Sequence, residues 1–165
     1  MLDLAAGGGR HTRLMVDMGF HAIAVDRDVA ALRPLADERC TICELDLENG
    51  DRWVLGGGYD GIVVTNYLHR PLFPAIGAAL ASGGVLIYET FAVGNERFGR
   101  PSNPAFLLRP GELLDAFADL TVIAFEQGEI SEPRAALIQR IAAVLGPLGR
   151  LPTEQRGASE PPQAA

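Results

Sequence analysis

The sequence contains no run of apolar residues long enough to span a membrane, and no secretory leader precedes its first strand-like segment. It is also poor in basic residues: 14 lysines and arginines are outnumbered by 21 aspartates and glutamates, which gives a net charge of -7. Because binding to a nucleic-acid backbone relies on basic surface, this balance argues against nucleic acid as a partner. We therefore expect a cytoplasmic protein whose partners are neither membranes nor nucleic acids.

Cysteine is limited to Cys40 and Cys43, which form a lone C-x-x-C pair. A zinc site would need two further ligands, and the three histidines stand singly and far apart in the sequence. Residues 41–46 alternate as in a strand, so the two thiols are not expected to face each other as a redox pair. The sequence predicts no metal site and no disulfide, with one cysteine in the core and one near the surface.

What the chain does contain is a glycine turn at its start. Residues 1–9 are a short apolar run that breaks into Gly7-Gly8-Gly9, and residues 10–15 then follow a helical pattern. This order predicts a strand, a tight turn and a helix. Glycines let a ligand approach the backbone closely, and the first N–H groups of a helix are unsatisfied. The sequence therefore predicts a nucleotide-like ligand at this turn.

Two common nucleotide-binding patterns are missing around that turn. No G-x-x-x-x-G-K-[ST] run occurs, and Thr12 takes the place of the third glycine in the G-x-G-x-x-G pattern of dinucleotide sites. Asp3 stands four residues before Gly7. A carboxylate beside the turn would repel a pyrophosphate, but it can balance an amino group or a sulfonium. These residues disfavour a nicotinamide-dependent oxidoreductase.

Acidic residues close the next two predicted strands. Asp26 follows the apolar residues 22–25, and Asp46 closes the alternating residues 41–46. The carboxyl ends of parallel strands lie at one edge of an α/β sheet, where such sheets bind ligands. Asp26 could accept hydrogen bonds from both ribose hydroxyls of an adenosine, and Asp46 could meet the adenine amino group. Either residue could instead cap the turn that follows it.

Strand-like and helix-like segments alternate along the chain, which predicts a doubly wound, mostly parallel α/β sheet with helices on both faces. Residues 90–108 form a long segment without a clear period, and residues 94–104 within it suit a lid over an acceptor or an ordered surface loop. Residues 146–165 are predicted to be a disordered tail, which leaves one domain over residues 1–145. Further strands are expected at residues 22–25, 41–46, 61–66, 85–89, 121–125 and 136–144, and helices at 29–36, 71–81 and 110–117. The composition of residues 136–144 also suits a helix.

Several of these segments resemble the motifs of class I S-adenosylmethionine-dependent methyltransferases. Residues 2–11 (LDLAAGGGRH) are similar to the first motif of that family, and residues 24–28 (AVDRD) resemble the second. The strand ends at Asp46-Leu47 and Asn66-Tyr67-Leu68 resemble the next two motifs. Small bacterial methyltransferases of the tellurite-resistance and thiopurine type are the most similar members.

This resemblance extends from residue 1 to about residue 145 and implies a Rossmann-like sheet of seven strands, with residues 136–144 as an antiparallel last strand. It also implies that the chain uses S-adenosyl-L-methionine to methylate a small-molecule acceptor. The cofactor contacts that it implies come from Asp3, Gly7, Gly9, Asp26, Asp46 and Asn66.

The start of the chain departs from the family pattern. Family members carry a helical segment before the first strand that helps to cover the cofactor and the acceptor, whereas Met1 already belongs to the first predicted strand. Either the start is truncated or misassigned, or the site is more open than usual.

Methyl transfer from a sulfonium needs little acid–base chemistry, because the electrophile is already activated. A general base is required only if the acceptor keeps its proton until late, and the candidates are Tyr67, His69 and Glu89. His69 could equally belong to a solvated loop, and Arg134 and Arg140 are expected to be solvated charges. The sequence thus predicts a methyltransferase, with a non-catalytic nucleotide-binding module as the alternative and a nicotinamide-dependent oxidoreductase as a weaker one.

Overall fold

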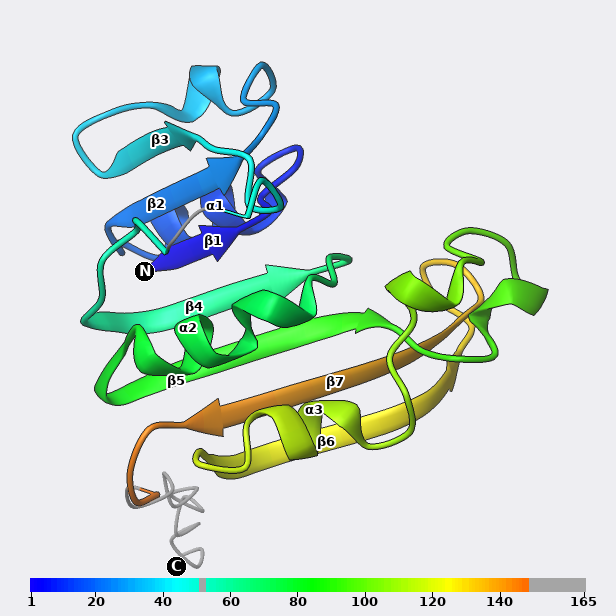
Figure 1. Cartoon of the computed structure of the whole chain (residues 1–165). Coiled ribbons are helices and arrows are strands. Elements are labelled where there is room, and N and C mark those ends of the chain that lie inside the picture. The colour runs from blue at the N-terminus through cyan, green and yellow to red at the C-terminus, as the bar shows by residue number, and fades with distance from the viewer. Residues whose placement is uncertain (51–52, 149–165) are drawn as a thin grey trace, which may run out of the picture.

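The computed structural model describes residues 1–50 and 53–148. Seven strands form a single sheet in the order β3-β2-β1-β4-β5-β7-β6 (Figure 1). Strand β7 pairs antiparallel with both of its neighbours, and the other pairs are parallel. The predicted mostly parallel sheet with an antiparallel last strand is therefore confirmed. The strands are β1 (Leu2–Leu4), β2 (Ala22–Asp26), β3 (Cys40–Glu44), β4 (Tyr59–Thr65), β5 (Leu80–Phe91), β6 (Thr121–Ile130) and β7 (Ala136–Val144).

Buried apolar residues on one face of the central strands fix how these strands pair. Leu2 and Leu4 of β1 are fully buried, as are Ile62 and Val64 of β4. Leu2 pairs with Ile62 and Leu4 pairs with Val64 in the register of the two strands. A slip by one residue would move every one of these side chains to the other face, so the pattern fixes the register.

Helices cover both faces of the sheet, as predicted. Helix α1 lies on one face beside β1 and β2, and helices α2 and α3 lie on the other (Figure 1). On the second face the rings of Phe73, Tyr88 and Phe117 pack together, with centroids 5.4 to 5.9 Å apart. This aromatic cluster joins the two short helices to β5 and adds to the burial of the core. The helices are α1 (Arg10–Asp17), α2 (Phe73–Ala78) and α3 (Glu112–Ala116).

Three predicted helices are shorter in the structure, and the one expected over residues 110–117 covers only Glu112–Ala116. Residues 29–36 contain only the single 3-10 turn Arg33–Leu35, because Pro34 has no N–H to continue a helical ladder. The helix expected over residues 71–81 ends at Ala78, because β5 already begins at Leu80. The helix predicted over residues 29–36 is therefore wrong, and the helix predicted over residues 71–81 is correctly placed but has different ends.

Two predicted strands are longer than expected. Strand β5 extends to Phe91 and β6 extends to Ile130, because the antiparallel β7 pairs with β5 up to Phe91 and with β6 up to Ile130. The long segment that follows β5 contains the 3-10 turns Asn95–Arg97 and Pro104–Phe106. The predicted loop is therefore ordered by short turns.

The other sequence-based expectations concern the cysteines and the tail. Cys40 is buried, Cys43 is half-buried, and both thiols are free, as predicted. No group of three or more acidic, histidine or cysteine side chains in the described part of the chain is placed to hold a metal.

No helix within residues 1–50 and 53–148 is long and apolar enough to cross a membrane. The predicted tail lies outside the described residues from position 149 onward.

The last glycine of the first turn has a structural reason of its own. Gly9 has a φ of 75°, which favours glycine. A Cβ at this position would lie 2.6 Å from Cδ1 of Leu35 and 2.8 Å from Cδ2 of Leu32. Gly8, in contrast, has no other atom within 4 Å of the place of a Cβ. Gly9 therefore lets the chain after β2 pack against the start of α1.

We expect Gly9→Ala to lower the free energy of unfolding by about 2–3 kcal/mol, because it adds a left-handed backbone penalty to an overpacked contact. Gly8→Ala is the matched control and should change the free energy by less than about 0.5 kcal/mol. Urea denaturation of the three proteins measures both values. Equal stability of the two variants would contradict this reading of Gly9.

Candidate functional site

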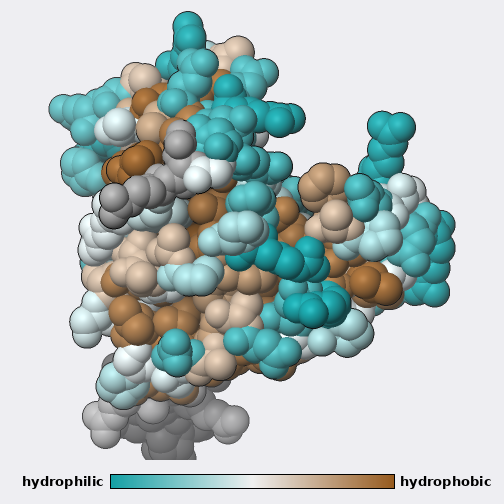
Figure 2. Space-filling view, viewed as in Figure 1, coloured by the Kyte–Doolittle hydropathy of each residue, from teal (hydrophilic) through white to brown (hydrophobic). Residues whose placement is uncertain are grey.

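A cavity of about 510 Å³ lies at the carboxyl edge of the parallel strands. In the space-filling view the surface is hollowed between the part built from β2 and β3 and the part built from the segment after β5 (Figure 2). This is the edge at which the sequence predicted ligand binding. The cavity is lined by Ala5, Asp26, Arg27, Leu45, Asp46, Leu47, Glu48, Asn66, Tyr67, Leu68, Thr90, Phe91, Pro101 and Phe106.

Asp26 lines this cavity and also fixes the glycine turn beside it. One carboxylate oxygen, Oδ2, accepts a hydrogen bond from the backbone N–H of Gly7 at 2.8 Å. The other, Oδ1, accepts from the backbone N–H of Asp28 at 3.0 Å. An ionised carboxylate has about four lone-pair sites, so Asp26 keeps acceptor capacity that faces the cavity.

Asp3 does not reach the cavity surface. It lies in β1, is only 1% exposed, and accepts a hydrogen bond from the hydroxyl of Thr12 at 2.5 Å. Burial raises the pKa of Asp3, and the Thr12 hydrogen bond and nearby His11 oppose that rise. Asp3 thus ties the first turn of α1 to β1, which explains why threonine occupies position 12. The buried Gly9 likewise lies outside the cavity lining, and Gly7 adjoins it through Asp26.

Two residues with left-handed backbone conformations sit at the ends of the two central strands. Ala5, directly after β1, has a φ of 57°, and Asn66, directly after β4, has a φ of 55°. Asparagine tolerates this region, whereas alanine pays about 1 kcal/mol or more for it. Both residues line the cavity. Such strain is concentrated at functional sites, and no signal in the sequence pointed to Ala5.

Asp46 and Glu48 form the acidic wall contributed by the segment after β3. Oδ1 of Asp46 accepts a hydrogen bond from the backbone N–H of Glu48 at 2.9 Å, so Asp46 caps this turn and lines the cavity at once. The turn-capping reading of Asp46 is therefore confirmed, and its contact with an adenine amino group stays a prediction. Glu48 and Arg27, the one cation in the lining, were missed because neither ends a strand.

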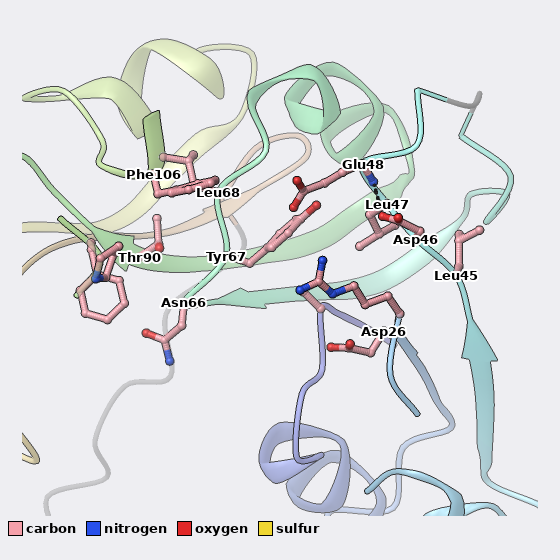
Figure 3. Close-up of a pocket in the computed structure, with 14 residues that line it drawn as sticks. Asp26, Leu45, Asp46, Leu47, Glu48, Asn66, Tyr67, Leu68, Thr90 and Phe106 are labelled. Atoms are coloured by element: carbon pink, nitrogen blue, oxygen red, sulfur yellow. Dashed lines mark hydrogen bonds between the residues drawn. The ribbon is translucent and has the colours of Figure 1, made fainter. Parts of the chain in front are cut away.

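Tyr67 contributes its ring to the cavity, and its hydroxyl end points toward the carboxylate of Glu48 (Figure 3). The hydroxyl is buried and has no hydrogen-bond partner among the described residues. Burial and the neighbouring Glu48 carboxylate both raise the pKa of Tyr67. The phenol is therefore held in its protonated form, which makes it a hydrogen-bond donor and a poor base at neutral pH.

The other two candidate bases lie elsewhere. Glu89 of β5 is outside this cavity and lies beside Arg140, with 3.4 Å between Oε2 and Nη1. Its neighbours Ile87 and Arg140 share a separate hollow with it. His69 is half-buried and is also absent from the cavity lining. Of the three candidates, the structure brings only Tyr67 to the cavity.

An ion pair holds the wall of the cavity that carries Phe106. Arg70 donates through Nε to Oε1 of Glu112 at 2.6 Å and through Nη2 to Oε2 at 2.9 Å. The same guanidinium donates to the backbone oxygens of Ala105 and Leu107, each at 2.8 Å. These contacts bracket Phe106 on both sides. Arg70 is therefore a positioning residue for this wall.

Comparisons with known proteins place the fold. No protein-family model and no curated protein matches the chain. Among solved structures, TehB from Haemophilus influenzae superposes with a TM-score of 0.70 at 15% identity, over 87% of this chain and 57% of TehB. An S-adenosylmethionine-dependent methyltransferase from Mesorhizobium loti gives 0.67 at 15% identity, over 87% and 89% of the two chains. The chain shares the fold of these solved structures.

A third neighbour is a complex with small molecules. The 1,6-didemethyltoxoflavin-N1-methyltransferase of Burkholderia thailandensis, bound to 1,6-didemethyltoxoflavin and S-adenosylhomocysteine, gives a TM-score of 0.63 at 20% identity. The match covers 87% of this chain and 69% of that one. At these identities the likeness establishes the fold, and the chain spans 57% of the length of TehB.

The Arg70–Glu112 pair generates a stability prediction. Burial alone would raise the pKa of Glu112, but hydrogen bonds from Arg70 and Arg109 outweigh it and lower the pKa to about 2, from an ordinary value of 4.5. We expect Glu112→Gln to cost about 2–3 kcal/mol of unfolding free energy at pH 7, because it leaves Arg70 without its charge partner.

Because the folded-state pKa of Glu112 is lowered, its contribution is complete above pH 4.5 and disappears as the pH falls toward 2. Denaturation at pH 7 and pH 3 should therefore show the gap between Glu112→Gln and the unmodified chain shrinking. Glu129→Gln is the control, since the Arg97–Glu129 pair is 57% exposed on both sides and is worth less than about 1 kcal/mol. A gap that is unchanged at pH 3 would contradict the role given to the pair.

Proposed function

We propose that the chain binds S-adenosyl-L-methionine in the cavity at the carboxyl edge of the sheet and transfers its methyl group to a small-molecule acceptor. The observation that carries this proposal is the carboxylate of Asp26, which lines the cavity while holding Gly7 of the glycine turn. Fold neighbours bound to S-adenosylmethionine or S-adenosylhomocysteine support the choice of cofactor. A cytoplasmic location and residues 1–145 as the functional domain stay predictions.

The acidic side of the cavity suits the adenosine half of the cofactor. Asp26 would accept hydrogen bonds from the ribose hydroxyls with its free lone pairs. Asp46 would face the adenine amino group, and the backbone at Gly7 and Asn66 would border the rest of the molecule. Asp3 and Gly9 would act indirectly, because each holds the turn that carries these contacts.

The bound cofactor supplies a methyl group that is already activated by its sulfonium. The work left to the chain is to align the acceptor with that methyl group and to keep water away. Phe91 and Phe106 provide an apolar wall for this purpose, and Arg70 holds Phe106 in place. Protonated Tyr67 can donate a hydrogen bond to a bound molecule. Glu89 and His69 do not line the cavity, so neither is placed to take a proton from the acceptor.

Two other functions make different predictions. A nicotinamide-dependent oxidoreductase would bind NAD in preference to S-adenosylmethionine, and Thr12 in the place of the third glycine of the dinucleotide pattern disfavours it. A non-catalytic binding module would bind S-adenosylmethionine without turnover. Equilibrium titration with both cofactors separates the first case, and turnover with a panel of thiol, amine and oxyanion acceptors separates the second.

Asp26→Asn is the direct test of the cofactor site. The amide has one acceptor oxygen, so it keeps one of the two backbone hydrogen bonds of Asp26, and its NH2 group cannot accept from a ribose hydroxyl. We expect the affinity for S-adenosylhomocysteine to fall about ten- to a hundredfold, as for a lost hydrogen bond to a charged group. Calorimetric titration measures the change.

Asp28→Asn is the matched control, because Asp28 is exposed, lies two residues further along and is absent from the cavity lining. It should leave the affinity within about twofold. Equal affinities of the Asp26 and Asp28 variants for S-adenosylhomocysteine would contradict the proposal that Asp26 binds the ribose hydroxyls.

A further inference from the structure

A second hollow, of about 590 Å³, continues the proposed cofactor cavity on the side of the segment after β5. The two share four lining residues, which shows that they form one connected space. These are Asn66, Phe91, Pro101 and Phe106. The second hollow therefore lies where an acceptor would enter.

The charges lining the two hollows are opposite. The proposed cofactor cavity carries three carboxylates, from Asp26, Asp46 and Glu48, against the single cation of Arg27. The second hollow is lined by Arg100 and Arg134 and by no acidic residue. A chain with a net charge of -7 thus presents a cationic surface beside this entrance.

The guanidinium groups of Arg100 and Arg134 form no ion pair within the described part of the chain. Among the described residues, Arg134 donates through Nη2 only to the backbone oxygen of Arg100, at 3.3 Å. Both side chains are exposed. Arg70 and Arg97, in contrast, each pair with a glutamate. Arg100 and Arg134 are therefore free to bind an anion.

A buried side chain holds this cationic surface in position. Asn95 is 1% exposed, and its amide donates to the backbone oxygen of Pro101 at 3.1 Å. Its Oδ1 accepts from the backbone N–H of Leu137 in β7, also at 3.1 Å. The segment that carries Arg100 is therefore tied to the sheet before any ligand arrives, which lowers the ordering cost of binding.

We infer that the methyl acceptor is a small aromatic carboxylate, whose ring lies against Phe91 and Phe106 and whose carboxylate meets Arg100 and Arg134. Guanidinium groups bind carboxylates through paired N–H donors, and apolar rings bind a planar body between them. This inference rests on the proposed methyl transfer, because it assigns the acceptor of that reaction.

The test compares two probes that differ in one charge, 4-mercaptobenzoate and 4-mercaptobenzamide. Each is titrated by calorimetry into the full chain, with and without S-adenosylhomocysteine. We expect the carboxylate to bind about five- to tenfold more tightly than the amide at low salt, and the preference to shrink as salt screens exposed charges.

Arg100→Gln and Arg134→Gln should each reduce that preference, and the double variant should bring it to within about twofold. Arg39→Gln is the matched control, because Arg39 is also exposed but lies outside both hollows. It should keep the full preference, and equal melting temperatures of the variants would show that folding is intact.

Equal binding of the two probes, binding of neither, or a preference that survives in the double variant would overturn the inference. Failure of S-adenosylhomocysteine to bind would instead contradict the proposed cofactor. Because the ratio of the two probes is also measured without S-adenosylhomocysteine, the two failures are distinguishable.

Discussion

The parallel pairing of β1 with β2 and β4 carries three chain turns to the same edge of the sheet. Ala5 follows β1, Asp26 closes β2 and Asn66 follows β4, and all three line one cavity. Without that pairing the Asp26 carboxylate would not reach the N–H of Gly7, which lies 19 residues away in the sequence. The register of the buried apolar residues therefore determines the geometry of the polar edge.

The sequence predicted those features that depend on a short stretch of neighbouring residues. The apolar runs predicted the central strands, and acids at strand ends predicted which edge would carry polar groups, as Asp26 and Asp46 now show. It failed where tertiary contacts decide. The extension of β5 to Phe91 and β6 to Ile130 depends on pairing with β7, which no local pattern of those strands contains.

Side chains of the same type also have different partners in the structure, and the sequence does not reveal which ones. Arg70 is bound to Glu112 and to two backbone oxygens, whereas Arg100 and Arg134 have no acidic partner among the described residues. Glu89 was expected to end its strand, but β5 continues to Phe91, and the Glu89 side chain lies by Arg140 and outside the cavity. Strand alternation decides which face such a side chain takes, and one residue of register is enough to change it.

The two sides of the connected cavity come from different parts of the chain. Its acidic side is made by residues 5–48, and the wall with Phe106 and Arg100 is made after β5 and is tied to β7 by Asn95. Asn66, Tyr67 and Phe91 lie where the two parts meet. Mutation in the later segment can therefore alter which molecules enter while the turn at Gly7 and Asp26 is unchanged. Such a division lets sequence changes in a single stretch of the chain alter the acceptor while the rest of the scaffold stays the same.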